Sequence, residues 1–312
     1  MACIDNGKEP MVSVVISAYK RPAYLNQALH SVYEQTFTDY EVIVVDDGSG
    51  DEYTRQYDLG RNTRLIVHDA AQRGCAATKN TGIKASRGRY VAFLDDDDLW
   101  LPGKLESQVR AMEEHPEVGL AFCHYTLVDQ DLHPLNYQRS PKKLPVDLFK
   151  RLLGGNIIKS PSAVMLRRDA IADVGGFNET LCGAEDWEMW IRVAYKYGFW
   201  SDDMPLILYR THPKQMTGKF LTCRRADMQV METIMKWSRR RALKSSGLVK
   251  SALCYRIQRL SKWECKHQGF FVALSLLFRA IRLRPFDVRN YSRLAESALI
   301  AFMRIIQDKR KA

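Results

Sequence analysis

The sequence contains no Cys-x-x-Cys pair, no apolar run long enough to span a bilayer and no tandem repeat. Its seven cysteines are odd in number and scattered, which argues against a disulfide framework or a zinc site and favours free thiols in a reducing compartment. The longest apolar run, residues 270–278, includes Ser275 and is only nine residues long, whereas a membrane-spanning helix needs about 18 or more. The first ten residues lack the apolar core of a signal peptide. These absences predict a cytoplasmic protein that is not integral to a membrane.

Charge is distributed unevenly along the chain. Residues 219–312 contain 22 Lys and Arg against 6 Asp and Glu, a net charge of +16. Residues 1–218 contain 25 against 30, a net charge of −5, so that the whole chain carries +11. The apolar fraction of 46% is that of a globular protein, and 312 residues are enough for two domains. We therefore predict a catalytic domain over residues 1–218 and a basic helical region over residues 219–312.

Runs of strand-forming residues alternate with helical patterns in the first part of the chain. Strands are expected at residues 12–18, 41–45, 64–68 and 89–94, and helices at residues 24–33, 74–85 and 102–115. Strands that alternate with helices of this length predict an α/β fold with a mostly parallel, Rossmann-like sheet flanked by helices. In such a sheet, ligands bind beyond the carboxyl ends of the strands.

Two acidic clusters lie at that edge of the predicted sheet. Asp46 and Asp47 follow the second strand, and Asp95 to Asp98 follow the fourth. Four adjacent carboxylates repel one another, so their clustering is costly unless they share a positive partner. A divalent metal ion with a bound diphosphate is the usual partner, since hard cations take oxygen ligands. A solvated acidic turn is the alternative, but the run directly follows a buried strand, which favours a binding site.

The motifs of this first part occur in the order typical of one enzyme family. From the N-terminus they are VSVVISAY with RP, EVIVVDDGS, KNTGI, FLDDDDLW, EDW and YRTHP. Over about residues 10–215 this series resembles glycosyltransferase family 2, which has the GT-A fold. The resemblance implies a nucleotide-sugar-dependent transferase of the kind that builds bacterial surface polysaccharide and lipopolysaccharide.

The resemblance also implies which residues bind the donor. The nucleotide base is expected at Ser17 and Asp47, where a carboxylate is apt because the N3–H group of uracil is a hydrogen-bond donor. The other donor-binding positions that match the family are Asp46, Lys79, Asn80, Asp95 and Asp96. Lys79 stands where many relatives carry arginine, so it keeps the charge and loses the bidentate fork. Ser17 and Asp47 also have a structural interpretation, as residues that cap the turns after their strands.

A metal site and a catalytic base are implied in the same way. Asp97 matches the direct ligand of Mn²⁺ or Mg²⁺, and His212 matches a histidine near the diphosphate or the metal. Asp98 matches a position that is often acidic, and Asp186 matches the catalytic base. The structural alternatives are a helix cap for Asp186, favoured by the helix dipole, and a packed loop histidine for His212.

In the inverting reaction that the family implies, an acceptor hydroxyl attacks the anomeric carbon while a nucleoside diphosphate leaves. A UDP-sugar donor and a glycan or lipid-linked acceptor are the expected substrates. Two other functions stay open. A sugar nucleotidyltransferase would carry a glycine-rich basic loop after the first strand, where this chain has SAYKRP. A degenerate transferase domain that acts as a membrane-bound assembly partner would lack Asp97 or Asp186, and both are present.

Three interpretations are open for residues 219–312. Their Lys and Arg, together with the apolar stretch at 270–285, suit peripheral attachment to an anionic membrane, at the inner face of the plasma membrane. Alternatively, these helices pack their apolar faces on the catalytic domain with the cations outward. Nucleic-acid binding is the third interpretation, and nothing in residues 1–218 suggests it.

Overall fold

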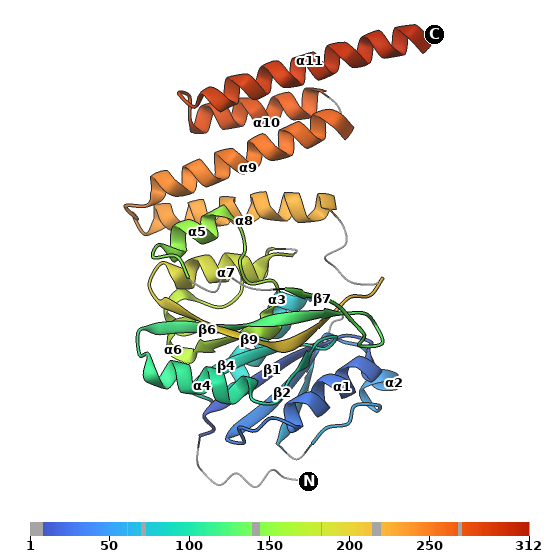
Figure 1. Cartoon of the computed structure of the whole chain (residues 1–312), viewed down its shortest axis with the longest axis vertical. Coiled ribbons are helices and arrows are strands. Elements are labelled where there is room, and N and C mark those ends of the chain that lie inside the picture. Colours follow the sequence, from blue (N-terminus) through green and yellow to red (C-terminus); the bar gives the residue numbers. More distant parts are fainter. Residues whose placement is uncertain are drawn as a thin grey trace. The chain divides into compact units, whose positions relative to one another are not determined.

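The computed structural model describes residues 9–60, 62–69, 73–138, 144–181, 183–213, 220–267 and 270–311. The chain divides into two compact units, Met1–Gly218 and Lys219–Ala312. The first unit is built on a sheet, and the described part of the second consists of helices (Figure 1). The functions that the sequence predicts for these two parts, a catalytic domain and a membrane-associating tail, stay predictions.

One mixed sheet forms the centre of the first unit. Its strands are β1 (Val12–Ala18), β2 (Tyr40–Asp46), β3 (Thr63–Val67), β4 (Tyr90–Asp95), β5 (Leu99–Trp100), β6 (Val118–Val128), β7 (Pro134–Gln138), β8 (Val164–Arg167) and β9 (Gly198–Arg210). The order is β3-β2-β1-β4-β8-β6-β9-β5, with β7 paired to β6. The first four strands of this order pair in parallel, whereas β8 pairs antiparallel with both β4 and β6.

Helices flank this sheet (Figure 1). They are α1 (Pro22–Tyr33), α2 (Asp51–Thr54), α3 (Cys75–Ala85), α4 (Lys104–Glu114), α5 (Leu148–Gly154), α6 (Arg168–Val174), α7 (Glu185–Ala194) and the 3-10 helix η1 (Pro161–Ala163). Strands β1, β2 and β4 are buried over nearly their whole length, so both of their faces are covered. This explains why their sequences are continuous apolar runs rather than alternating ones. The predicted α/β fold is confirmed.

Strand register brings the acidic clusters to one edge of the sheet. Ser17 near the end of β1 lies opposite Asp95 at the end of β4. On the other side of β1, Ala18 lies opposite Asp46 at the end of β2. Parallel strands end at the same edge, and the polar residues that follow β1, β2 and β4 therefore start from neighbouring positions.

Helix α3 packs directly on β1 at this edge. A Cβ atom on Gly82 would lie 2.2 Å from Cγ1 of Val15, so only glycine permits the observed approach of the helix. The close packing carries Lys79, one turn earlier, to within 2.9 Å of Asp95. A glycine in the helix interior costs helix stability, and here it brings a cation to the strand ends.

The second unit consists of α8 (Phe220–Arg240), α9 (Ser246–His267), α10 (Phe270–Leu283) and α11 (Val288–Lys311). Asn290, which is fully buried, links the turn between α10 and α11 to α9. Its Nδ2 donates to the carbonyl oxygen of Arg284 at 2.8 Å, and its Oδ1 accepts from Nε2 of Gln258 at 2.6 Å. Crossing a bilayer would need a longer or more apolar helix than any that the described residues form.

Helix α4 of the first unit carries a fully buried lysine, Lys104. Its Nζ lies 3.8 Å from the centroid of the Trp100 ring, and no described residue forms a hydrogen bond with it. Burial lowers the pKa of Lys104 to about 7, and the nearby Cys123 thiol offsets this only in part. A charged ammonium is costly in such surroundings, so Lys104 makes the stability of the first unit depend on pH.

We expect the free energy of unfolding to rise between about pH 7 and about pH 10, with Lys104 contributing up to about 1.4 kcal/mol per pH unit. In this interval the unfolded chain still binds the lysine proton and the folded chain has released it, so a higher pH favours the folded state. The free energy of unfolding of the Lys104→Met variant, measured in urea at several pH values, should rise less steeply with pH because it lacks the contribution of Lys104. Lys84→Met, at an exposed position, is the control and should retain it. Equal slopes in all three proteins would contradict the prediction.

Candidate active site

The four aspartates at the end of β4 and directly after it alternate between partly exposed and buried side chains. The side chains of Asp95 and Asp97 are 28% and 17% exposed, whereas Asp96 and Asp98 are 1% exposed. The alternation separates two carboxylates that a ligand can reach from two that the protein holds. The reachable pair has the Asp-x-Asp spacing from which the sequence predicts donor and metal binding.

Asp98 anchors this acidic loop from the inside. Its Oδ2 accepts hydrogen bonds from the hydroxyls of Ser160 and Ser162, at 3.0 and 2.6 Å. Its Oδ1 accepts from the backbone N–H of Arg210 at 3.1 Å. Burial raises the pKa of Asp98 well above its usual range, and the neighbouring carboxylates raise it further. The loop is thereby joined to the segment before β8 and to the end of β9.

Arg21, the residue before α1, supplies a cation to the acidic loop. Its guanidinium donates to Oδ1 of Asp96 at 2.5 Å and to Oδ2 of Asp97 at 2.6 Å. Its Nη1 also lies 3.3 Å from Nε2 of His212. Burial raises the pKa of Asp96, although the charge of Arg21 lowers it. Sequence reasoning used Arg21 only as part of a motif and missed it as a site residue.

His212 lies beside Asp97, just after β9. Its Nε2 is 3.1 Å from Oδ2 of Asp97, and its ring packs on Tyr24 with a centroid separation of 5.6 Å. The buried Arg210, two residues earlier, donates from Nε to the backbone oxygen of Asp97 at 2.9 Å. Arg210 therefore holds the backbone that carries Asp97, and it too was missed as a site residue.

Lys79 pairs with the other exposed carboxylate of the loop. Its Nζ donates to Oδ1 of Asp95 at 2.9 Å, and the lysine side chain is 3% exposed. Burial lowers the pKa of Lys79, but the carboxylates of Asp95 and Glu185 contribute to raising it overall. The lysine is thus kept charged, and it offsets the charge of Asp95.

Asp46 closes the turn after β2. It is fully buried and accepts three hydrogen bonds, from the backbone N–H of Ser49 at 2.7 Å, the Ser49 hydroxyl at 2.6 Å and the Tyr57 hydroxyl at 2.5 Å. All three are local contacts within the turn and the segment that follows it. This geometry favours a structural role for Asp46, and its predicted role in donor binding stays a prediction.

Asp47 and Ser17 face α3 and the loop before it. Oδ1 of Asp47 lies 3.0 Å from Nδ1 of His68 and accepts from one of the backbone N–H groups of residues 73–74, while Oδ2 accepts from the other. An ionised carboxylate offers about four lone-pair sites, and the described residues occupy three of those on Asp47. Ser17 accepts a hydrogen bond from the Thr78 hydroxyl at 3.0 Å.

Asn80 connects α3 to the segment before α7. Its Nδ2 donates to the carbonyl oxygen of Phe177 at 2.9 Å and to Glu179 at 2.8 Å, and its Oδ1 accepts from the Phe177 N–H at 2.8 Å. A Cβ atom on Gly176 would lie 2.4 Å from Oδ1 of Asn80. The amide is therefore engaged in protein contacts, and its donor-binding role also stays a prediction.

Asp186 lies in the first turn of α7. Its Oδ2 accepts from Nδ2 of Asn156 at 3.2 Å, and its Oδ1 accepts from the next backbone N–H at 2.6 Å. Burial raises the pKa of Asp186 to about 7, and the charge of Glu185 adds to this effect. The charges of Lys79 and Asp95 also act on Asp186. Motifs about ninety residues apart in sequence therefore belong to one electrostatic environment.

A separate acidic group occupies the turn between β6 and β7. One ligand atom each of Asp129, Asp131 and His133 lies within 4.8 Å of the others. Oδ1 of Asp129 accepts from the backbone N–H groups of the other two residues, both at 2.9 Å. These bonds account for the turn, and we assign no ligand to it.

Comparisons with known proteins identify the family. The model of Glycosyl transferase family 2 matches residues 13–175, which is more than half of the chain. An uncharacterized glycosyltransferase of Rickettsia typhi is 30% identical over 227 residues, which are 70% of this chain and 69% of that protein. The chain belongs to glycosyl transferase family 2. The resemblance inferred from its motifs is confirmed, and the protein is a glycosyltransferase.

Two further comparisons concern a curated relative and solved structures of this family's fold. A protein of Bacillus subtilis named "Putative teichuronic acid biosynthesis glycosyltransferase TuaG" is 35% identical over 143 residues, 45% of this chain and 56% of that one. S. aureus TarS 1–349 in complex with UDP has a TM-score of 0.59 and 17% identity, covering 92% of this chain and 88% of that one. Mannosyltransferase PcManGT of Pyrobaculum calidifontis, in complex with GDP-Man and Mn²⁺, has a TM-score of 0.55 and 18% identity, covering 97% and 88%. The expected GT-A fold is confirmed.

For this family 2 transferase, we predict that Arg21→Met lowers the free energy of unfolding by about 1–3 kcal/mol, because it leaves the buried Asp96 carboxylate without its cation. The Arg21 side chain is 33% exposed, so the loss should be smaller than for a fully buried pair. Chemical denaturation without divalent metal measures the change, and Arg21→Lys should restore part of the stability. Arg55→Met removes a fully solvent-facing ion pair and is the control, expected to be near neutral. Equal stability of Arg21→Met and wild type would refute this role of Arg21.

Proposed function

We propose that this protein is an inverting glycosyltransferase that transfers a sugar from a UDP-sugar to a hydroxyl group of a glycan or lipid-linked acceptor. The observation that carries the proposal is the two-sided acidic loop. Its exposed pair is Asp95 and Asp97, and the charge of Asp95 acts on Asp186, the predicted base. This coupling supports a site that combines a donor-side carboxylate with an acceptor-side one.

We infer that Asp97 and His212 hold a Mn²⁺ or Mg²⁺ ion. Their ligand atoms are 3.1 Å apart, which suits two neighbouring ligands of an octahedral ion with bonds of about 2.1 Å. Nη1 of Arg21 lies 2.6 and 3.3 Å from the same two atoms, so the position already suits a positive charge. Mn²⁺ in the PcManGT complex supports the inference. When bound, the metal would act as a Lewis acid towards the diphosphate leaving group.

Asp186 is the proposed general base. Its pKa of about 7 suits a group that must accept a proton near neutral pH. In the reaction, the bond from the anomeric carbon to the diphosphate oxygen breaks, the bond to the acceptor oxygen forms, and the acceptor proton moves to Asp186. Asn156 orients the Oδ2 atom. Asp186 is not the N-cap residue of α7, which is Ala184. Its Oδ1 nevertheless accepts from a backbone N–H in the first turn of the helix, so a structural role stands beside the proposed catalytic one.

The lone-pair site on Asp47 to which no described residue donates supports uridine as the base of the donor. Three of about four acceptor sites of this carboxylate are engaged. The remaining site matches the single N3–H donor of uracil, whereas the edge of guanine presents donors on two nitrogens. UDP and UDP-GlcNAc in the TarS complexes agree with this preference, and GDP-Man in PcManGT is the competing case.

A membrane location and a polysaccharide product are part of the proposal. The name of the Bacillus subtilis relative, which refers to teichuronic acid biosynthesis, supports a cell-surface polysaccharide as the product. A lipid-linked acceptor would bring the reaction to the inner face of the plasma membrane. Lipopolysaccharide and other surface glycans are the acceptor classes to test.

The proposed function is tested with purified full-length protein and a panel of UDP-, GDP- and dTDP-sugars in the presence of Mn²⁺. We expect turnover of a UDP-sugar, by slow hydrolysis or by transfer, and its loss in excess EDTA. Incubation with a sugar 1-phosphate and a nucleoside triphosphate tests the nucleotidyltransferase alternative, which would release pyrophosphate. Turnover that is unchanged in EDTA would refute the metal requirement. No turnover of any donor would favour the alternative of a degenerate transferase domain that acts as an assembly partner.

The base assignment predicts that Asp186→Asn lowers kcat by about 10²–10⁴-fold without abolishing the thermal shift caused by UDP and Mn²⁺. Asp97→Asn should abolish both sugar transfer and the thermal shift, because it removes the proposed metal ligand. In the wild type, kcat should increase as pH rises through about 7, since only the ionised Asp186 accepts a proton. Glu114→Gln, at an exposed position, is the control. Near-normal transfer by Asp186→Asn would overturn the assignment.

A further inference from the structure

Helix α10 has an apolar face that its own unit does not cover. Phe271 and Phe278 are 82% and 55% exposed, and they lie seven residues apart, two turns along one side of the helix. The opposite side, which contains Ala273 and Leu277, is fully buried. A helix with apolar residues on both sides ordinarily lies inside a core, and contiguous exposed apolar surface of this kind marks an interaction site.

The turn that follows α10 and the start of α11 expose two more apolar residues. Phe286 and Val288 are 97% and 79% exposed. They are not on a loose end, because Asn290 bonds the carbonyl of Arg284 on one side and Gln258 of α9 on the other. We call Phe271, Phe278, Phe286 and Val288 the aromatic face.

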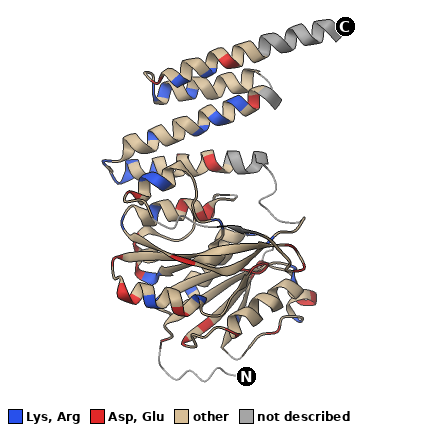
Figure 2. Cartoon of the chain, in the orientation of Figure 1, with Lys and Arg blue, Asp and Glu red and all other residues tan. Residues whose placement is uncertain are grey.

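Basic side chains surround the aromatic face. Arg282 follows Phe278 by one turn on the same side of α10, and both Arg282 and Lys250 are exposed, with no carboxylate partner among the described residues. Figure 2 shows that basic residues are frequent along the helices of this unit and acidic ones are few. The net charge of residues 219–312 is +16.

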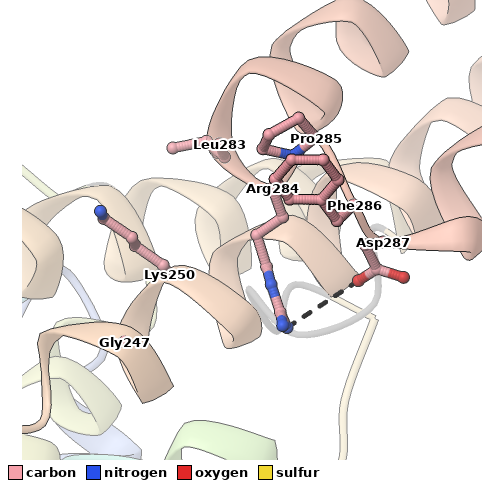
Figure 3. Close-up of a pocket in the computed structure, with 7 residues that line it drawn as sticks. All are labelled: Gly247, Lys250, Leu283, Arg284, Pro285, Phe286 and Asp287. Atoms are coloured by element: carbon pink, nitrogen blue, oxygen red, sulfur yellow. Dashed lines mark ion pairs between the residues drawn. The ribbon is translucent and has the colours of Figure 1, made fainter.

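A hollow of about 330 Å³ lies beside Phe286, between the start of α9 and the turn after α10. Figure 3 shows Lys250 on one side of this hollow and Arg284 on the other. Its one carboxylate, Asp287, accepts two hydrogen bonds from the guanidinium of Arg289, at 2.8 and 2.7 Å. Arg284 also pairs with Asp287, at 3.9 Å, and donates to the Ser251 hydroxyl at 2.7 Å. Of the cations that line the hollow, Lys250 is therefore the one left to attract an anion.

We propose that the aromatic face docks on an anionic lipid bilayer, with lipid phosphates at Lys250 and Arg282. Phenylalanines that enter the interface and cations that meet the headgroups are the combination that binds peripheral proteins to lipid. A second copy of the chain would bring two strongly positive units together, and a nucleic acid would leave the apolar side chains in water. The proposal concerns the second unit and does not rest on the donor chemistry proposed for the first.

Vesicle binding by the full-length protein tests the proposal in the absence of any nucleotide sugar. We expect binding to vesicles that contain phosphatidylglycerol and at least about tenfold weaker binding to phosphatidylcholine alone, since Lys and Arg at the surface are attracted to anionic headgroups. High salt should weaken the binding. Failure to bind anionic vesicles, or equal binding to both kinds, would overturn the proposal even if glycosyl transfer is normal.

Variants separate the apolar from the electrostatic contribution. A Phe271→Ser, Phe278→Ser, Phe286→Ser triple variant should weaken anionic-vesicle binding by at least about tenfold, because it removes three apolar rings that would enter the interface. Lys250→Gln with Arg282→Gln should reduce the binding and flatten its salt dependence. Leu135→Ser with Met204→Ser removes exposed apolar residues of the first unit and is the matched control, expected to bind as wild type does.

Two outcomes with the triple variant would identify a different occupant of the aromatic face. A lower molecular mass in solution than that of the wild type, with unchanged vesicle binding, would show an interface between copies of this chain. A lower Tm with unchanged vesicle binding would show that the face packs within the protein. Either result would overturn the proposal, whereas lost binding with unchanged Tm and mass would support it.

Discussion

The arrangement of the first unit depends on two buried carboxylates that lie two residues apart in the sequence, Asp96 and Asp98. Removing a carboxylate from water is costly unless hydrogen bonds or cations compensate it. Here the compensation comes from three distant segments: Arg21 before α1, the serines before β8, and Arg210 at the end of β9. Because the acidic loop needs all of these partners, it joins the parallel and antiparallel parts of the sheet. The positions of the exposed carboxylates follow from those of the buried ones.

This arrangement determines what a ligand meets at the site. Asp95 is already paired with Lys79, and Asp97 is already paired with Arg21. A metal ion at Asp97 would therefore not neutralise a free charge but would compete with a guanidinium for the same oxygen. The metal affinity would be the difference between the two interactions, which makes binding weaker and more reversible than the cluster of four aspartates suggests. The displaced guanidinium would then be free to meet the diphosphate, whose charge it complements.

The strands, and the edge of the sheet where the motifs lie, could be predicted from the sequence, because strands buried on both faces are continuous apolar runs. The sequence did not predict the long pairing of β6 with β9, whose mixed polar and apolar sequences have no simple period. In the site, family motifs predicted roles for Asp97 and Asp186 but not the contacts that position these residues. Arg21 and Asp97 are 76 residues apart, and local spacing carries no information about such contacts. Asp46 and Asp47 are neighbours in sequence, yet a turn gives them separate partners.

In the proposed docking of the second unit, charged residues and apolar residues would act over different distances. Residues 219–312, which carry +16, would be attracted to anionic lipid, whereas residues 1–218, which carry −5, would not. Screening limits such attraction to charges within about 8–10 Å of the lipid at physiological salt, so net charge alone would bring the protein near a membrane without orienting it. Orientation needs a short-range interaction, and exposed phenylalanines would supply one because their burial is favourable only in direct contact with an apolar partner such as acyl chains. Arg282 and Phe278, one turn apart on α10, would thus act at different ranges on the same surface.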